Sequence, residues 1–136
     1  MNDVILNKTV IIERCIKRIV DVYQEVGDNL ATDFTRQDSI LLNLQRACEA
    51  SIDLANYITK QQSLGIPQRS RDSFTFLYKA GFITEALAAN LGKMVGLRNI
   101  AVHYYQELNL DIVKFVIETH LVDFREFIKL VKCLSV

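Results

Sequence analysis

The sequence predicts an all-α fold, an antiparallel four-helix bundle with one short additional helix. Half of the 136 residues are hydrophobic, Pro occurs once and Gly five times, a composition that suits a compact helical protein and disfavours a turn-rich β sandwich. Apolar residues recur mainly at steps of three and four along four long stretches, which is the period of one helix face. Clusters of Gly, Pro, Asn and Asp between the stretches end one helix before the next begins.

The first two long helices follow each other with a brief interruption. Apolar spacing predicts a first helix over about residues 4–26, and the segment 27–29, Gly-Asp-Asn, ends it. A second apolar stripe predicts a helix that starts after Thr35, the expected N-cap, and runs to about Gln62. The segment 63–67, which contains the single Pro, ends that helix.

A short helix connects the two halves of the predicted bundle. Asp72 or Ser73 can cap it, and it runs through Tyr78. Gly81 is expected to end it in a left-handed conformation.

Two further long helices complete the prediction. Residues 84–85, Thr-Glu, open a third long helix that carries an apolar stripe to Ala101. The last helix begins near Asn109 or Asp111 and continues to Leu134. Because the connections are short, sequential helices are expected to be antiparallel neighbours.

The chain is predicted to form one domain, residues 1–136, because it contains no repeat, low-complexity tract or linker. Its N-terminus lacks the features of a signal peptide, and no apolar run approaches the roughly 20 residues of a membrane span. Cys15, Cys48 and Cys133 lie far apart without a metal-binding spacing, so we expect small buried hydrophobic residues in a reducing compartment. These features predict a cytoplasmic protein with no membrane attachment, metal or cofactor.

Charge is informative when it is divided along the chain. Sixteen basic and sixteen acidic residues balance, so any attraction to nucleic acid must come from a local patch. Residues 60–98 hold six basic and two acidic side chains, whereas residues 1–59 hold six basic and nine acidic ones. A basic excess of this size is also typical of a solvated surface without a partner.

The most informative stretch is residues 98–105, R-N-I-A-V-H-Y-Y, in which four residues separate Arg98 from His103. Arginine carries a permanent charge on a planar fork that suits phosphate, and histidine exchanges protons near neutral pH. Together they suffice in principle for metal-free cleavage of a phosphodiester. A structural alternative makes Arg98 a surface cation and His103 a cap at a helix C-terminus. The second histidine, His120, has no motif around it and is assigned a structural role.

The spacing of the motif raises a geometric problem. On an ideal helix Arg98 and His103 point about 140° apart, so a continuous helix cannot bring them together within one chain. Either the helix ends near Val102 and His103 turns back, or a second copy of the chain brings its own motif to the first. Gly92 and Gly96 permit close backbone approach at such an interface or, equally well, inside the monomer.

The string R-N-x3-H-x-Y, formed by Arg98, Asn99, His103 and Tyr105, resembles the R-x4-6-H signature of the HEPN superfamily. Its R-x4-H-x-Y form is similar to that of the HepT toxins of prokaryotic toxin–antitoxin pairs. The resemblance implies a HEPN-like helical bundle that dimerises, so that paired motifs line a cleft. It also implies a metal-independent endoribonuclease that is the toxin of a type VII-like system.

In the implied reaction the RNA 2′-hydroxyl attacks the adjacent phosphate and leaves a 2′,3′-cyclic phosphate. His103 is the expected general base or acid, and the His103 of a second subunit is a candidate for the complementary role. Arg98 is expected to stabilise charge on the phosphate, with Asn99 supporting it by hydrogen bonding. Further candidate RNA contacts are Arg71, Lys79, Lys93 and Tyr104.

The resemblance further implies a protein partner, a small nucleotidyltransferase of the MNT type that acts as antitoxin. It is expected to transfer AMP from ATP to the motif tyrosine, which matches Tyr105, with Tyr104 as the nearest competitor. An attached AMP brings negative charge beside Arg98 and opposes RNA binding. The alternative function is a non-catalytic nucleotide- or substrate-binding partner of a nucleotidyltransferase, and the intact His103 favours the nuclease. The RNA cleaved and the stoichiometry do not follow from the sequence.

Overall fold

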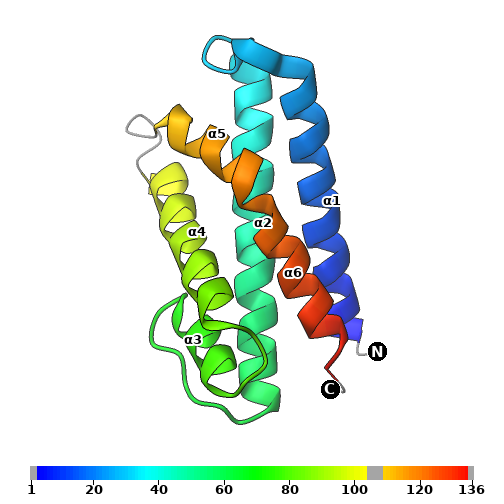
Figure 1. The fold of residues 1–136 in the computed structure, drawn as a ribbon, viewed down its shortest axis with the longest axis vertical. Helices are drawn as coiled ribbons and strands as arrows, with labels where there is room; N and C mark the ends of the chain where they lie inside the picture. The colour runs from blue at the N-terminus through cyan, green and yellow to red at the C-terminus, as the bar shows by residue number, and fades with distance from the viewer. Residues whose placement is uncertain (1–2, 104–108, 135–136) are drawn as a thin grey trace.

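The computed structural model describes residues 3–103 and 109–134, except for the side chains of residues 102 and 103. The regular structure of these residues consists of α1 Asp3–Val26, η1 Gly27–Asn29, α2 Phe34–Gln61, α3 Asp72–Lys79, α4 Glu85–His103, α5 Leu110–Thr119 and α6 Leu121–Lys132. Helices α1, α2 and α4 run alternately up and down the bundle, and α5 and α6 together form the fourth limb (Figure 1). The all-α prediction is confirmed.

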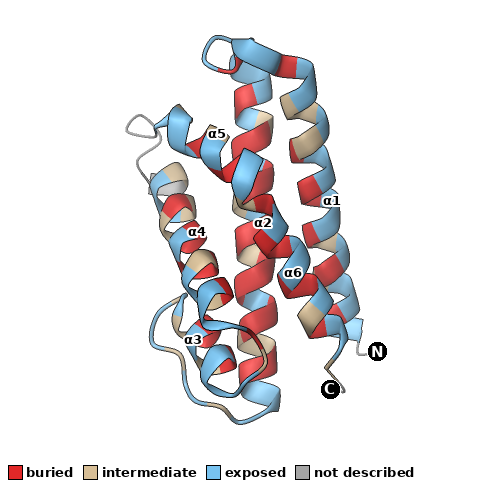
Figure 2. Cartoon of the chain, in the orientation of Figure 1, coloured by how far each residue is buried: buried red, intermediate tan, exposed pale blue. Residues whose placement is uncertain are grey.

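One cluster of buried apolar side chains fills the space between these helices. In Figure 2 the buried residues lie along the sides of α1, α2 and α4 that face their neighbours. The predicted stripe of α1 is confirmed, since Ile5, Ile12 and Ile19 are almost completely buried. The short α3 is held by Phe74, whose ring packs edge-to-face on that of Phe127 in α6 with 5.7 Å between centroids.

Polar side chains determine where the long helices start. Asp33 accepts a hydrogen bond from the backbone N–H of Arg36 at 3.1 Å, and this bond lowers the pKa of the Asp33 carboxyl. The prediction that Thr35 caps α2 was therefore wrong, because an aspartate two residues earlier supplies the cap and Thr35 is already helical. At α4 the hydroxyl of Thr84 accepts from the backbone N–H of Leu87 at 3.1 Å, as the predicted start requires.

The turn before α3 uses Asp72 in a different way from the one predicted. Its carboxylate accepts from the backbone N–H groups of Gln68 and Arg69, both at 2.9 Å, and these bonds lower its pKa. Neither Asp72 nor Ser73 acts as the N-cap of α3, because the helix begins at Asp72 itself. Gly81 has the predicted left-handed conformation, with φ at +83°.

The prediction of a single last helix was wrong. The helix is interrupted at His120, where φ is −120° and ψ is −2°. The hydroxyl of Thr119 donates to the carbonyl of Phe115 one turn earlier, a bond that tends to bend helices. His120 Nδ1 lies 2.8 Å from Asp123 Oδ2 in the first turn of α6, so this histidine joins the two helices.

The apolar length of the helices and the burial of the cysteines can be compared with the sequence predictions. No helix among the described residues is both long and apolar enough to cross a membrane. Cys15 and Cys48 are buried, as predicted. Cys133 is exposed, contrary to prediction, because it follows the last residue of α6.

Candidate functional site

Helix α4 carries the first part of the motif. Arg98 and Asn99 lie in its C-terminal half, and the backbone stays helical through His103. The side chain of His103 lies outside the part of the chain that the structure describes, as do Tyr104 and Tyr105. Because α4 includes His103, the helix does not end before it, and five steps along a regular helix rotate the backbone by about 140°.

Arg98 faces α2 and pairs with a carboxylate there. Its Nη1 lies 3.6 Å from Oε1 of Glu49, which is an ion-pair distance but too long for a good hydrogen bond. The Arg98 side chain is only 19% exposed, and its buried Nε has no hydrogen-bond partner among the described residues. An unsatisfied buried donor costs about 1–3 kcal/mol, so this resting arrangement is not fully stabilised.

The wall behind Arg98 is apolar and close-packed. Cys48, on α2, is buried, and its thiol lies 3.6 Å from the carbonyl of Met94 in α4. Burial raises the pKa of Cys48 to about 12, while the charge of Arg98 opposes the rise and that of Glu49 adds to it. Arg98 therefore interacts electrostatically with two adjacent residues of α2, the thiol of Cys48 and the carboxylate of Glu49.

Asn99 faces a different neighbour from Arg98. It lines a hollow of about 510 Å³ together with Val95 and with Arg69, Ser70 and Arg71 from the segment that precedes α3. The structure thus brings together Asn99 and Arg71, two residues that the sequence singled out separately. Asn99 is exposed and belongs to the motif itself, so this hollow borders the motif.

A second hollow, of about 410 Å³, continues along α3 and α4. Arg71 and Lys93 line it, together with Tyr78, whose hydroxyl donates to Glu85. Lys79 is exposed but is not among the residues lining either hollow. Of the predicted RNA contacts that the structure describes, Arg71 and Lys93 therefore line one hollow, and Lys79 does not.

The two glycines of α4 lie beneath the Arg71 side chain. A Cβ atom added to Gly92 would lie 3.9 Å from Arg71 Cβ, and one added to Gly96 would lie 3.7 Å from Arg71 Nη2. Both distances are ordinary van der Waals contacts. Tight packing inside the monomer therefore does not require either glycine.

A mostly apolar groove of about 220 Å³ separates α4 from α5. Met94 and Leu97 of α4 and Val116 of α5 form part of it. Ile112 and Phe115 also line it, although their residues are 51% and 55% exposed. Apolar surface is thus left uncovered beside the motif helix.

Sequence reasoning missed Glu49, which is far from the motif in the chain but beside Arg98 in space. The available signal was its position directly after the buried Cys48, at the edge of the stripe by which α2 faces α4. Among the described residues, no group of three or more His, Cys, Asp or Glu side chains is placed to hold a metal ion.

Comparison with known proteins places this helical motif in a family. A family model described as Ribonuclease HepT-like matches residues 12–131. The chain belongs to the HepT-like ribonuclease family. Among HepT-like relatives, the mRNA nuclease HepT of Shewanella oneidensis is 62% identical over 132 residues, which cover 97% of this chain and 98% of that protein.

Solved structures of HepT-like proteins agree closely with this fold. The tri-AMPylated Shewanella oneidensis HEPN toxin, in complex with MNT antitoxin, gives a TM-score of 0.94 at 61% identity and covers 98% of this chain and 100% of that one. A toxin–antitoxin structure with AMP-PNP gives a TM-score of 0.92 at 61% identity, with coverages of 96% and 99%. The resemblance to HEPN proteins inferred from the motif is confirmed.

Proposed function

We propose that this protein is the toxin of a type VII-like toxin–antitoxin pair and that it acts in the cytoplasm as a metal-independent endoribonuclease. The observation that carries the proposal is the 62% identity, over 97% of this chain, to a protein named as an mRNA nuclease. The position of Arg98 and His103 on one helix that borders two hollows supports a site for RNA there.

The proposed reaction is a transesterification within the RNA strand. The 2′-hydroxyl oxygen forms a bond to the adjacent phosphorus while the bond from phosphorus to the 5′-oxygen breaks, which leaves a 2′,3′-cyclic phosphate and a 5′-hydroxyl. His103 accepts the 2′-hydroxyl proton, and a second acid gives a proton to the leaving oxygen. Arg98 stabilises the negative charge that grows on the phosphate oxygens, and Asn99 orients the phosphate.

RNA binding then involves an exchange of partners at Arg98. In the structure its guanidinium is held by Glu49 at 3.6 Å. A phosphate offers a bidentate, charge-assisted contact in better geometry than this long ion pair. Glu49 therefore keeps Arg98 on the α2 side of the site until substrate arrives.

We further propose that the protein acts as a homodimer. Since α4 is helical through His103, one chain does not bring Arg98 and His103 together by turning back before the histidine. A second copy supplies its own His103 as the acid. The uncovered apolar side chains between α4 and α5, Ile112 and Phe115 among them, support a partner on this side of the bundle.

Control by an antitoxin completes the proposal. The relative named above was solved as a tri-AMPylated toxin in complex with MNT antitoxin. For this chain we place AMP on Tyr105, two positions after His103, with Tyr104 as the alternative acceptor. Each added phosphodiester brings about one negative charge next to Arg98, which then has a competing anion in place of RNA.

Cleavage assays test the catalytic part. Purified protein should cut RNA in EDTA and leave cyclic-phosphate ends, while His103→Ala should lose cleavage. Arg98→Lys should lose most activity, because an ammonium point charge does not reproduce a bidentate guanidinium contact. Loss of cleavage on chelation, or full activity of His103→Ala, would contradict the mechanism and favour a protein that only binds RNA or nucleotide.

Mass spectrometry tests the proposed inactivation of the toxin by AMP transfer. Incubation with the cognate nucleotidyltransferase, ATP and Mg²⁺ should add whole adenylyl groups and abolish cleavage. Tyr105→Phe, which keeps the ring and removes the acceptor oxygen, should stay unmodified and active. If AMP appeared elsewhere, or if none appeared while the antitoxin still neutralised the toxin, occlusion of the site would be the better explanation.

A further inference from the structure

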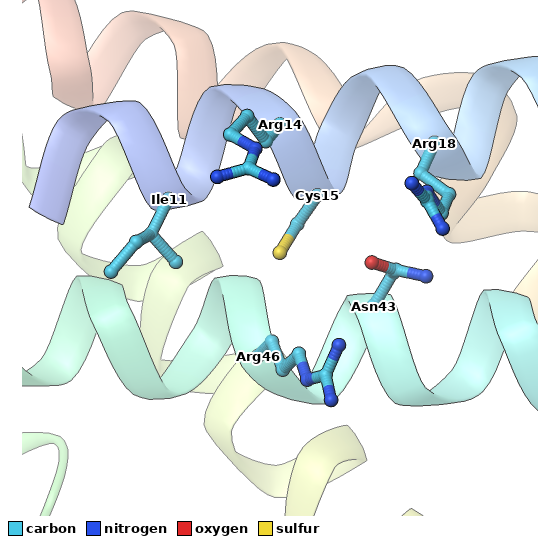
Figure 3. A pocket seen from close by; sticks show the side chains of 6 residues that line it. All are labelled: Ile11, Arg14, Cys15, Arg18, Asn43 and Arg46. Atoms are coloured by element: carbon cyan, nitrogen blue, oxygen red, sulfur yellow. The ribbon is translucent and has the colours of Figure 1, made fainter.

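Three arginines line a pocket between α1 and α2. It has a volume of about 390 Å³ and is lined by Ile11, Arg14, Cys15, Arg18, Asn43 and Arg46. Figure 3 shows Arg14 and Arg18 on one helix, facing Arg46 and Asn43 on the other, with the Cys15 sulfur directed into the space between them. Among the residues that the structure describes, no acidic side chain lines this pocket.

None of these three arginines has an ion-pair partner among the described residues. Arg36 and Arg98 each lie within ion-pair distance of a carboxylate, whereas no such pair involves Arg14, Arg18 or Arg46 in the described residues. Three like charges around one small space repel one another, and a bound anion removes this repulsion. The cluster is therefore a prepared site for an anion.

The thiol of Cys15 provides an independent sign that the three charges converge. Burial raises the pKa of this thiol, and the charges of Arg46, Arg14 and Arg18 all oppose the rise. One point on the floor of the pocket thus experiences all three guanidinium groups. Asn43 is also buried there, and its amide nitrogen is fixed by donating to the Ser39 carbonyl at 2.8 Å.

The fold creates this cluster from a segment whose overall charge is negative. Residues 1–59 hold six basic and nine acidic side chains. Acidic side chains of the segment are paired with cations elsewhere, namely Glu13 with Lys132, Asp21 with Lys17, Glu25 with Arg36 and Asp53 with Lys8. These four carboxylates are thus paired away from the pocket, and the pocket arginines have no ion pair among the described residues.

We propose that this pocket binds backbone phosphates of the RNA strand that flank the phosphate to be cleaved. The inference deepens the ribonuclease function proposed above and rests on it. Arginine forks suit phosphate oxygens, and a chain with no net charge needs a local cluster to hold a polyanion. The apolar surface of Ile11 contributes no competing charge.

The pocket and the motif are neighbours across α2. Arg46 lies one helical turn before Glu49, and side chains three apart on a helix have Cβ atoms about 5–6 Å apart. Glu49 in turn is paired with Arg98. A single strand lying across the outer face of α2 therefore meets the arginine pocket on one side and Arg98 on the other.

RNA binding by the full-length protein tests the proposal. A fluorescently labelled single-stranded RNA of mixed sequence is titrated by anisotropy into His103→Ala protein, so that no cleavage occurs, at several salt concentrations. Adding Arg46→Gln should weaken binding about fivefold and reduce the slope of log affinity against log salt by about 0.7, the value of one phosphate contact to a single strand. Arg46→Lys should keep most of the slope.

Arg125→Gln is the matched control, because Arg125 on α6 also lacks an ion pair in the described residues but shares its hollow with Glu13 and Asp21. It should leave affinity and slope nearly unchanged. Replacing Arg14, Arg18 and Arg46 together by Gln should lower the slope by about 2. Circular dichroism checks that each variant is folded, and the single variants carry the test if the triple variant is not.

The outcomes separate this proposal from the ribonuclease function. If the unmodified protein cleaves RNA but the Arg46→Gln and triple variants bind it as the parent does, the pocket proposal is overturned and the nuclease stands. If no RNA is cleaved but the pocket variants lose RNA binding, the catalytic proposal alone fails. If the triple variant keeps RNA binding and loses the complex with the nucleotidyltransferase, the pocket is a protein interface and our inference is wrong.

Discussion

Two requirements on Arg98 conflict when no substrate is bound. In the proposed reaction its charge must be available for phosphate, yet an unpaired guanidinium that is only 19% exposed would be costly. Glu49 reduces this cost at 3.6 Å without the short contact that would make release difficult. The pair is therefore loose, and partly exposed pairs of this kind contribute about 1 kcal/mol or less.

A change at Glu49 should reveal this competition. In the His103→Ala background, Glu49→Gln removes the rival carboxylate, so RNA should bind about threefold more tightly in anisotropy titrations. Glu126→Gln removes one negative charge from an exposed position of α6. It is the control for the effect on RNA binding of removing any one negative charge from the protein. Weaker binding of Glu49→Gln would indicate instead that Glu49 orients Arg98 for the phosphate.

Helices α1 and α5 are tied by a hydrogen bond whose strength should depend on pH. The hydroxyl of Tyr23 donates to Glu118 at 2.6 Å, and this bond is the main reason why the pKa of Tyr23 is raised to about 12. Because the pKa of Tyr23 is higher in the folded protein, the bond stabilises the fold fully at pH values below about 10, the pKa of tyrosine in the unfolded chain. This stabilisation is lost as the pH rises through the pKa of Tyr23 in the folded protein. Tyr23→Phe should lower the free energy of unfolding by about 1 kcal/mol at pH 8.

Urea titrations at several pH values can check this expectation. The difference between Tyr23→Phe and the parent should narrow as the pH rises from about 10 towards 12. A difference that stayed constant over this range would show that the bond does not govern the stability of the contact.

Substitution of Gly96 in α4 tests whether this glycine is needed for packing within the monomer. An alanine methyl at position 96 has room, since it would lie 3.7 Å from Arg71 Nη2. Alanine also favours helix over glycine by about 1 kcal/mol, so Gly96→Ala should raise the free energy of unfolding by up to that amount in urea titrations. A stabilised variant with impaired RNA cleavage would mean that the glycine serves the hollow beside Asn99 or a subunit interface.

The sequence predicts helices well where their ends carry recognisable polar or glycine signals. The stripes of α1, α2 and α4, the Thr84 cap and the left-handed Gly81 all appear in the structure. The break at His120 could not be predicted, because apolar spacing continues on both sides of it and the bend depends on the bond from Thr119 to Phe115. Thr35 and Asp33 are both acceptable caps by residue type, and in the structure it is Asp33 that accepts the bond from the Arg36 N–H.

The candidate site was only partly accessible from the sequence. Arg98, Asn99 and His103 are found because they are close in the chain and form a motif. Glu49 and the arginine pocket are not, because they depend on which faces of α1, α2 and α4 meet. A charge count by segments pointed to residues 60–98, whereas a group of three arginines without an ion pair among the described residues lies in the acidic segment.

If the active site is shared between two subunits, the protein should be a dimer, and mixing two inactive variants should restore some cleavage activity. Light scattering at micromolar concentration should give about twice the chain mass of 15.6 kDa. Inactive His103→Ala chains mixed with inactive Arg98→Ala chains should recover a small part of the cleavage activity, because the mixed dimer then retains one Arg98 and one His103 from different chains, although it lacks the second histidine. A strict monomer with full activity would refute the shared site.

The interruption at His120 has a consequence for how the folded protein opens. It separates α5, with three buried residues, from α6, with six, so the two halves of the fourth limb need not unfold together. Amide hydrogens of Leu110–Thr119 should exchange with solvent through a local opening that low concentrations of urea do not alter, while those of α2 should exchange only on global unfolding. Native-state hydrogen exchange followed by mass spectrometry would then show that α5, which lines the groove beside α4, unfolds locally while the core stays folded.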